Sequence, residues 1–365
     1  TTYNSYLIVD EQVTLIDTVE EEFYDTMMER IRSVIGERTI DNVIVQHAEP
    51  DHSGGFLKFM KDYPNARPYA SNAGVGIMLK QYFKSYDFQR VKTGDTLSTG
   101  RYTLTFVEMP MIHWPDNMLT YVAEQKIAFS NDAFGQHIAS YDIFDDAHGA
   151  AKCIDRAKDY YANIVMPYGM QVANKLKQIQ DMNLDIDMIA PAHGIIWRSY
   201  LPELFQAYED FATFKAVDKA VIVYESVWKH TQMMAEALAE GMGRNGICVK
   251  IFKCSMTSPA IIQKELLDAK AVLVGSGNYN NAMAGSIAAF LEKLITCKVK
   301  NKKGLGFGSY GWANLVTKEI NARLGKAGIT LLNDEVVSQN YTPSEADLDA
   351  LMELGKQIAE EIKAM

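Results

Sequence analysis

The chain has 365 residues, which at roughly 100–200 residues per domain predicts two domains or three. Hydrophobic residues make up 48% and charged residues 22%, so the composition excludes a disordered chain, a collagen and a disulfide scaffold. The 46 acidic residues outnumber the 36 basic ones, and a formal net charge of −10 disfavours binding to the phosphate backbone of nucleic acids. No apolar run approaches the ~18 residues that a membrane span needs.

The cysteines bear on the compartment and on the kind of metal site. They are scattered, without a C-x-x-C pair, at Cys153, Cys248, Cys254 and Cys297. This pattern argues against a disulfide framework, a zinc ribbon, a rubredoxin-type site and a cysteine-ligated iron–sulfur cluster, and it favours a reducing cytoplasm. The sequence starts at Thr1 without a methionine and runs directly into a strand-like stretch at 6–9, so we expect the natural N-terminus to lie upstream.

In the first part of the chain, strand-like runs mix with helical patterns, and the loops between them carry His, Asp and Glu. The strand-like runs lie at 13–16, 42–45, 102–107, 118–122 and 127–129. Near residues 212–219 this mixture gives way to a regular alternation of apolar runs and helical patterns. We therefore place a first domain at residues 1–215 and a second at 216–365.

In the second part, apolar runs alternate regularly with helical patterns. The runs at 220–224, 247–252, 271–275, 304–308 and 329–332 predict buried parallel strands. Helical patterns lie around 231–240, 259–267, 286–294 and 317–324. The last helix is predicted to start with Thr342 as its cap, Pro343 in the first turn and Glu345 three residues after the cap. Five strands with intervening helices predict a flavodoxin-like, doubly wound parallel sheet.

A dense group of potential metal ligands follows the strand-like run at 42–45. Its members are His47, Glu49, Asp51 and His52. Pro50 and the glycines that follow are predicted to keep this loop out of helix. In extended backbone, alternate residues project to the same side, so His47, Glu49 and Asp51 can converge. His52 then points elsewhere and could reach a second ion.

Three later loops offer one further candidate each: His113, Asp132 and His193. Each follows a strand-like run and precedes Pro, Gly or a small residue, as residues on functional loops tend to do. A lone His or Asp in such a place is usually a cap or a satisfied polar group. The group at 47–52 is different, because burying two carboxylates and two imidazoles together without a cation is costly. The cluster therefore favours a metal site.

The motif H-x-E-x-D-H at 47–52, followed by separate His, Asp and His loops, resembles the metallo-β-lactamase fold. Zinc-binding members of that fold usually have His at the third motif position, where this chain has Glu49. Glu49 at this position, together with the sequence segments at 1–4, 113–116, 130–136 and 160–163, resembles the flavodiiron proteins (A-type flavoproteins). The likeness spans essentially the whole chain. It implies an N-terminal metallo-β-lactamase-like αββα sandwich followed by a flavodoxin-like domain.

The resemblance gives each candidate a role. One iron would be bound by His47, Glu49 and His113, the other by Asp51, His52 and His193, and Asp132 would bridge the two. Oxygen donors beside imidazole, with no thiolate, also suit iron or manganese on chemical grounds. Open coordination positions on both ions would take a diatomic substrate.

Two pocket residues are weaker candidates for a catalytic role. Tyr160 matches a family tyrosine whose hydroxyl could donate a hydrogen bond to bound oxygen or nitric oxide; the alternative is a half-buried helix tyrosine. His137 lies five residues after Asp132 and could line the same pocket, or it could be a loop histidine bonded to backbone.

The first strand-to-helix turn of the second domain predicts a phosphate site, which is where flavodoxins place the phosphate of FMN. Hydroxyls and free backbone N–H groups at a helix start suit a monophosphate, although helix capping explains the hydroxyls equally well. The phosphate candidates are Ser226 and Thr231, and the residues that would line the loop are Val227, Trp228 and His230.

Two later loops favour a flavin at the same edge of the sheet. They supply Ser276, Gly277, Asn278, Tyr279, Asn280 and Asn281 after the third strand, and Ser309, Tyr310, Gly311 and Trp312 after the fourth. Loops at the carboxyl ends of adjacent parallel strands are where an open α/β sheet binds its ligand. Gly277 and Asn278 stand where the family usually has Pro and Thr, which could alter FMN affinity or donor docking. The alternative is a flavodoxin-like domain without flavin.

The resemblance implies an enzyme that reduces dioxygen to water, nitric oxide to nitrous oxide, or both, at a non-haem diiron site with electrons from FMN. It also implies a head-to-tail homodimer or a dimer of dimers, because the two sites of one chain would be too far apart for fast electron transfer. Without rubredoxin-type cysteines the chain would need an external donor, either a rubredoxin-like protein or a reduced deazaflavin. The preferred gas and the donor stay open.

Two other functions compete with this one. The first is a zinc hydrolase of the metallo-β-lactamase class with an appended flavodoxin-like domain, against which Glu49 in place of His counts. The second is an electron-transfer or scaffold protein with a vestigial metal site, against which the complete ligand set counts.

Overall fold

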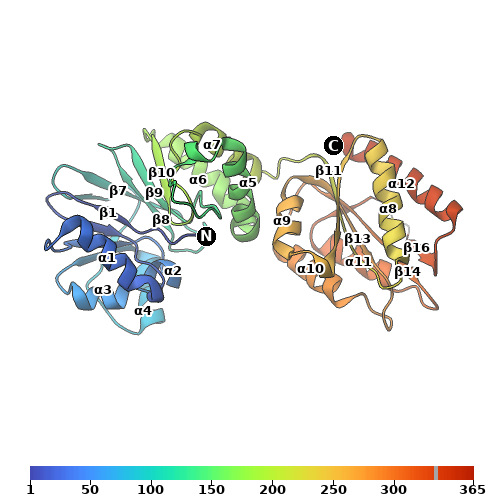
Figure 1. Ribbon diagram of the computed structural model, residues 1–365, viewed down its shortest axis with the longest axis horizontal. Helices are drawn as coiled ribbons and strands as arrows, with labels where there is room; N and C mark the ends of the chain where they lie inside the picture. The colour runs from blue at the N-terminus through green and yellow to red at the C-terminus, as the bar shows by residue number, and fades with distance from the viewer. Residues whose placement is uncertain (333–335) are drawn as a thin grey trace. The chain divides into compact units, whose positions relative to one another are not determined.

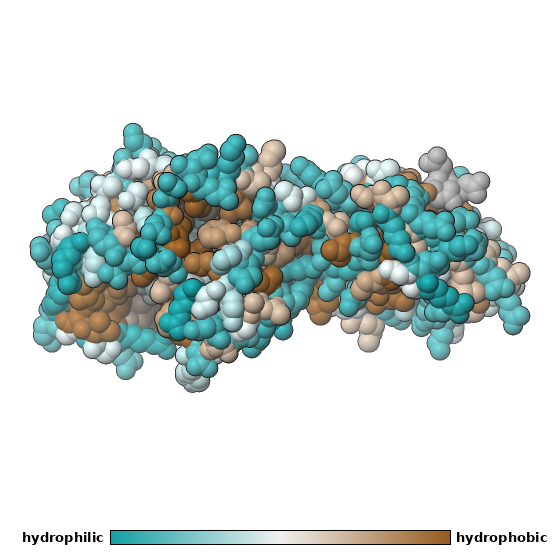
Figure 2. Space-filling view, turned by 90° about the horizontal axis from the view of Figure 1, so that it is seen from above, coloured by the Kyte–Doolittle hydropathy of each residue, from teal (hydrophilic) through white to brown (hydrophobic). Residues whose placement is uncertain are grey.

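The computed structural model describes residues 1–332 and 336–365, and these residues form two compact units, Thr1–Glu209 and Asp210–Met365 (Figure 1). The boundary that we place between residues 215 and 216 stays a prediction. None of the helices in the described ranges is long and apolar enough to span a bilayer. Polar residues cover most of the face seen in Figure 2, and apolar residues reach the surface there in separate patches.

The first unit is built on two five-stranded sheets. The first sheet has the order β1 (Tyr6–Ile8), β2 (Thr14–Ile16), β3 (Asn42–Val45), β4 (Arg67–Ser71) and β5 (Gln89–Val91). The second has the order β10 (Met188–Pro191), β9 (Ile127–Asn131), β8 (Met118–Val122), β7 (Thr103–Glu108) and β6 (Thr96–Ser98). The pairs β1–β2 and β6 to β9 are antiparallel, whereas β2 to β5 and β9–β10 are parallel.

The two sheets face each other across a shared apolar core. Ile16 and Ile44 of the first sheet are fully buried in one cluster with Phe106 of the second. Val43 and Val45 alternate to the other face of β3 and pack with helix residues such as Phe59. Helices thus cover the sandwich from outside, and the expected αββα sandwich is confirmed (Figure 1).

The helices of this unit fall into two groups. The first group follows the strands of the first sheet: α1 (Tyr24–Ile35), α2 (Pro50–Ser53), α3 (Phe56–Asp62) and α4 (Asn72–Tyr82). The second group belongs to the later part of the chain: α5 (Ala150–Tyr160), α6 (Gly169–Asp181) and α7 (Leu201–Ala212). A π-helical turn at Tyr161–Val165 continues α5 directly, and π-turns of this kind are frequent at functional sites.

A buried carboxylate ties the two sheets together at the edge where the ligand-bearing loops begin. Asp17 follows β2, and its carboxylate accepts hydrogen bonds from the Gln46 backbone N (2.7 Å) and from Asn131 Nδ2 (3.0 Å). Gln46 immediately precedes His47, and Asn131 immediately precedes Asp132. The ends of β3 and β9 are therefore held side by side, although they belong to different sheets.

The second unit contains one parallel sheet. Its strands are β11 (Val217–Glu225), β12 (Cys248–Lys253), β13 (Ala269–Ser276), β14 (Lys303–Tyr310), β15 (Thr330–Leu331) and β16 (Val337–Asn340). Their order is β12-β11-β13-β14-β15, and β16 also pairs with β14. The flavodoxin-like architecture is confirmed, but the predicted last strand at 329–332 covers β15 and misses β16. The reason is local, since the polar sequence Val-Ser-Gln-Asn of β16 gives no apolar run.

Helices cover both faces of this sheet. They are α8 (His230–Arg244), α9 (Pro259–Leu267), α10 (Gly285–Thr296), α11 (Val316–Lys326) and α12 (Glu345–Lys363). α8 and α12 lie together on one face (Figure 1), where a Cβ at Gly241 would meet the Met352 carbonyl oxygen at 2.0 Å. Glycine at this position therefore allows the two helix backbones to approach each other closely.

The cap of α12 differs from the sequence prediction. Ser344 caps the helix: its Oγ accepts from Asp347 N at 3.3 Å, and Asp347 Oδ2 accepts from Ser344 N at 2.9 Å. The predicted cap, Thr342, is wrong by two residues, and its Oγ1 lies 3.0 Å from His230 Nε2. Ser344 prevails because its side chain and that of Asp347 together close two reciprocal backbone bonds.

We expect Ser344→Ala to lower the free energy of unfolding by about 1 kcal/mol, because the variant leaves the Asp347 backbone N–H, in the first turn, without its acceptor. Urea denaturation followed by circular dichroism measures the loss. Thr342→Ala is the matched control and should cost clearly less. A larger loss in the control would contradict the observed cap.

Candidate metal centre

Four predicted ligands form a first group, in which one ligand atom of each residue lies within 4.8 Å of the others: His47, Glu49, His113 and Asp132. Glu49 Oε2 lies 3.1 Å from His47 Nε2 and 3.2 Å from His113 Nε2. Asp132 Oδ2 lies 3.5 Å and 3.3 Å from the same two nitrogens. Two imidazole nitrogens and two carboxylate oxygens therefore face one point.

A second group consists of Asp51, His52 and His193. The two oxygens of Asp51 lie 3.3 Å from His52 Nε2 and 3.2 Å from His193 Nε2. Asp132 Oδ1 lies 3.1 Å and 3.2 Å from these nitrogens. Asp132 thus turns one carboxylate oxygen to each group, which is the geometry of a bridging ligand.

The local argument from extended backbone is wrong for residues 50–53. Pro50 begins the short helix α2, and Glu49 stands at its N-cap. Proline suits the first helical turn, because its φ angle is already helical and its missing N–H would have no partner there. The helix turns Asp51 away from Glu49 and places it with His52 in the second group. The grouping is the one that the family resemblance implies.

The residues fit a cation. His47, His52, Asp132 and His193 are all at most 5% exposed. Within the described part of the chain, the buried atoms Asp51 Oδ1, His52 Nε2 and Asp132 Oδ2 have no hydrogen-bond partner. Buried polar atoms without partners are rare and destabilising, and a bound metal ion gives each of them a ligand bond. Imidazole and carboxylate without thiolate suit iron or manganese.

The electrostatics of the cluster agree with this fit. Burial lowers the pKa of His47, but hydrogen bonds with Asp116 and Glu49 outweigh it and raise the pKa to about 10. His193 follows the same pattern, because Asp132 and Asp51 raise its pKa to about 10 against the effect of burial. The carboxylates therefore create a field that favours positive charge at the imidazoles, and the same field attracts a metal cation.

Asp116 and the backbone carbonyl of Thr2 orient two of the histidines. His47 Nδ1 donates to Asp116 Oδ2 at 3.1 Å, and Ala48 N donates to the same oxygen at 2.7 Å. His193 Nδ1 donates to the Thr2 carbonyl at 2.7 Å. Both histidines then present Nε2 to the cluster, as metal-binding histidines with an outer partner do. Neither partner was predicted from the sequence, although Asp116 is the last residue of the family-like segment at 113–116.

We expect Asp116→Ala to weaken iron binding by about 10- to 100-fold, because the variant leaves His47 free to rotate and to change tautomer. Titration of the metal-free protein with ferrous iron measures the affinity. Asp62→Ala is the control, since Asp62 likewise accepts from an aromatic side chain, the Tyr24 hydroxyl at 2.8 Å, outside the cluster. Unchanged iron affinity in Asp116→Ala would contradict the orienting role.

The two pocket candidates have different surroundings. The Tyr160 hydroxyl donates to Asp132 Oδ1 at 3.1 Å, and burial raises its pKa well above the usual value. Tyr160 is therefore a neutral hydrogen-bond donor beside the bridging carboxylate. His137 is exposed, and its ring packs 5.2 Å from the ring of Tyr160. Catalytic roles for both residues stay predictions.

The three loops predicted for the flavin meet at the carboxyl edge of the second sheet. Thr231, fully buried near the start of α8, has its Oγ1 2.9 Å from Ser309 Oγ near the end of β14, where the third loop begins. In the second loop, Asn278 N donates to the Ser309 carbonyl at 3.1 Å. Ser309 therefore connects the first loop with the second.

The remaining flavin candidates surround this junction in two ways. Some are engaged in local turns: Ser276 Oγ accepts from Ala284 N at 3.0 Å, and Tyr279 N donates to the Ala282 carbonyl at 2.8 Å. The left-handed turn residues are Asn280 and Asn281. Others are strongly exposed, above all Trp228 at 80% and Trp312 at 89%. An exposed indole just before α8 and another in the loop after β14 both offer stacking surfaces to a planar ring.

Comparison with known proteins agrees with both halves of the chain. Residues 1–194 match the ODP family beta lactamase model, and residues 222–355 match the flavodoxin model. A nitric oxide reductase of Moorella thermoacetica is 41% identical over 99% of this chain and 91% of its own length. An anaerobic nitric oxide reductase flavorubredoxin of Vibrio vulnificus is 36% identical over 98% of this chain and 73% of its own length.

Solved structures with similar folds cover the chain nearly completely. Rubredoxin oxygen:oxidoreductase from Desulfovibrio gigas superposes with a TM-score of 0.96 at 35% identity, covering 99% of this chain and 91% of its own. A flavodiiron protein from Giardia intestinalis superposes with a TM-score of 0.95 at 27% identity, covering 99% and 89%. The chain belongs to the flavodiiron protein family.

Proposed function

We propose that the chain reduces a diatomic gas, nitric oxide to nitrous oxide or dioxygen to water, at a pair of iron ions supplied with electrons by FMN. One observation carries this proposal: the two oxygens of Asp132 face two separate groups of imidazoles and carboxylates. The names of the relatives, which are nitric oxide reductases and a rubredoxin oxygen:oxidoreductase, support the same reaction class.

In this proposal the iron ligands are the seven residues of the two groups: His47, Glu49 and His113 on one side, Asp51, His52 and His193 on the other, and Asp132 between them. The irons would supply two electrons and open positions for the gas, and FMN would pass on electrons one at a time. The protein keeps the ligands oriented through Asp116 and the Thr2 carbonyl. Tyr160, whose hydroxyl donates to Asp132 Oδ1, would supply a hydrogen-bond donor beside the metal pair.

FMN would lie on the carboxyl edge of the second sheet, with its phosphate at the start of α8. Thr231 and Ser226 are the proposed hydroxyl donors, and Trp228 and Trp312 are the proposed stacking residues. The proximity of Thr231 and Ser309 supports this placement, because it brings two of the three loops to the same point. The residues 276–281 would approach the ring from the second loop.

The donor and the assembly are finer proposals. A rubredoxin-like protein fits as donor, since two of the relatives carry rubredoxin in their names, and a reduced deazaflavin is the other candidate. We also propose a head-to-tail homodimer, in which a second copy would cover the exposed indoles of Trp228 and Trp312. A reducing cytoplasm fits the four cysteines, all of which are free thiols.

Metal and flavin analysis followed by a gas pulse tests the proposed function. Two irons and one FMN per chain are expected, and the reduced protein should consume nitric oxide or oxygen. Zinc without flavin would support the hydrolase instead, and a loaded protein that consumes neither gas would support a vestigial site. Comparing turnover of the two gases with one donor then decides the preference.

A further inference from the structure

The loop at 191–194, which carries His193, is held by the segment at 2–6. Asn4 accounts for three of the bonds: its backbone N donates to the Ala192 carbonyl at 2.8 Å, and its Nδ2 donates to the carbonyls of Pro191 at 3.0 Å and Gly194 at 2.9 Å. The Asn4 amide thus bonds to both ends of the loop.

Thr2 completes the attachment and reaches the histidine itself. Gly194 N donates to Thr2 Oγ1 at 2.7 Å, and His193 Nδ1 donates to the Thr2 carbonyl at 2.7 Å. The bond at Nδ1 fixes the tautomer in which Nε2 is free to face Asp51 and Asp132. The position of the Thr2 carbonyl relative to the loop therefore decides where His193 Nε2 points.

Gln136, from a different part of the chain, forms hydrogen bonds with the same loop and with Ile195. Its side chain accepts from Ile195 N at 2.7 Å and donates to the Ile195 carbonyl at 2.8 Å, and its backbone N donates to the His193 carbonyl at 3.1 Å. These bonds fix the backbone of the loop. They leave the ring nitrogen of His193 to Thr2.

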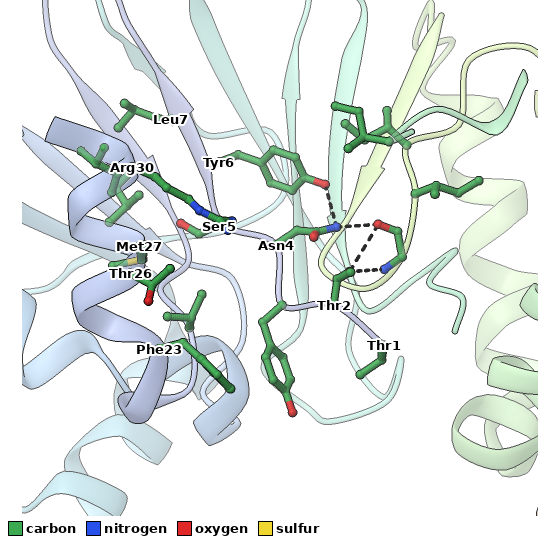
Figure 3. A pocket seen from close by; sticks show the side chains of 18 of the residues that line it. Thr1, Thr2, Asn4, Ser5, Tyr6, Leu7, Phe23, Thr26, Met27 and Arg30 are labelled. Carbon is green, nitrogen blue, oxygen red and sulfur yellow. Dashed lines mark hydrogen bonds between the residues drawn. The ribbon is translucent and has the colours of Figure 1, made fainter. Parts of the chain in front are cut away.

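A hollow of about 560 Å³ lies beside the segment at 2–6 (Figure 3). Its lining includes Thr2, Asn4, Arg30 and Gly194. The segment is open to the hollow on that side, although Tyr3 and Tyr6 pack against apolar clusters elsewhere, and hydrogen bonds set the register of Asn4 with the loop. Water in the hollow can replace a lost hydrogen bond, but it cannot fix the distance between two chain segments.

We propose that Asn4 is a positioning residue for the second iron: it holds the 191–194 loop in register with Thr2, so that His193 Nε2 meets Asp51 and Asp132. The inference rests on the proposed diiron function and deepens it. Asn4 acts through His193, whereas the ligands of the first group have no bond to the segment at 2–6. Removing the Asn4 amide should therefore weaken the binding of one iron of the pair and leave the binding of the other unchanged.

The test follows iron release from the loaded protein to a ferrous chelator. Wild type should release its two irons slowly. In Asn4→Ala, one iron per chain should leave up to about 10- to 100-fold faster, because misplacing the Thr2 carbonyl costs at most the affinity that is lost with an outer partner of a metal ligand, while the second iron keeps the wild-type rate. The electron paramagnetic resonance signal of the half-reduced pair should change, and one FMN per chain should remain.

Ser5→Ala is the matched control. Ser5 is the next residue, and its Oγ also donates to backbone carbonyls, those of Ile16 at 3.3 Å and Asp17 at 2.7 Å, but on the β2 side. It should release iron as wild type does. If Asn4→Ala does not fold, Thr2→Val removes the acceptor of Gly194 N and the weaker bond to the Gly194 carbonyl at 3.4 Å, keeps the Thr2 carbonyl, and should show the same one-iron effect more weakly.

Two results would overturn the inference: wild-type release of both irons in Asn4→Ala, or equal acceleration of both irons with a lower melting temperature, which would mean a purely structural role. Failure of the underlying function looks different, because wild type itself would then bind no iron pair. The two failures are therefore distinguishable in one experiment.

Discussion

Asp132→Ala is expected to abolish gas reduction while leaving the flavin bound. Asp132 turns one carboxylate oxygen to each group, with Oδ2 near His47 and His113 and Oδ1 near His52 and His193. Its removal takes an oxygen ligand from each proposed iron at once. Since loss of a single outer partner already costs about 10- to 100-fold in metal affinity, we expect turnover to fall by at least about 100-fold.

Iron and flavin analysis of Asp132→Ala, together with gas-consumption rates, measures this effect. Asp10→Ala is the control, because Asp10 is another buried carboxylate of the same unit, which accepts from Thr99 Oγ1 at 2.9 Å and Arg101 Nε at 3.0 Å outside the cluster. The control should lose stability but keep its irons. Loss of flavin with full iron in Asp132→Ala would contradict the assignment of the two cofactors to the two units.

The types of the ligands could be predicted from the sequence, but their grouping could not be predicted from local geometry. His47, Asp132 and His193 each follow a strand, and strand ends are visible as apolar runs that stop at polar loops. The partition of Glu49 from Asp51 depends on whether Pro50 bends the chain into helix, and proline permits both a loop and a first helical turn. The family resemblance supplied the grouping that periodicity missed.

The hydrogen-bond partners that orient His47 and His193 could not be predicted from the sequence, because they are long-range or backbone contacts. Asp116 lies 69 positions after His47, and Thr2 contacts His193 through a carbonyl that every residue possesses. A backbone acceptor leaves no trace in residue type. The same reason hides Asn4, whose amide binds two carbonyls nearly 190 residues away. Tertiary packing decides such contacts, and a single sequence does not report it.

In the second unit, apolar runs in the sequence predicted the buried strands but missed the polar strand β16. β11 and β13 are buried on both faces, so hydrophobicity alone identifies them. β16 is a polar strand that is recognised by its pairing with β14. The meeting of the three loops predicted for the flavin could be foreseen because they follow β11, β13 and β14, and the rule for parallel sheets places such loops at one edge.

The edge of the second sheet gives a second prediction, which complements the one for Asp132→Ala. Thr231→Val should weaken flavin binding and leave the irons bound. The Thr231 hydroxyl is fully buried near the N-terminus of α8, where we place the phosphate of FMN, and valine keeps its shape without the hydroxyl. A hydrogen bond to a charged group is worth about 1.5–3 kcal/mol, which corresponds to about 10- to 100-fold weaker FMN binding. The irons should be unaffected, because their ligands belong to the other unit.

Fluorescence titration of flavin-free protein with FMN measures the affinity of Thr231→Val. Turnover with an external donor should fall at low FMN and recover when FMN is added in excess, since the fold and the metal centre persist. Thr296→Val is the control: its hydroxyl donates to the Lys293 carbonyl at the end of α10, away from the loops. Wild-type FMN affinity in Thr231→Val would move the phosphate away from this turn. Joint loss of flavin and iron would show that the two centres depend on each other, so that gas reduction could not be divided between two independent units.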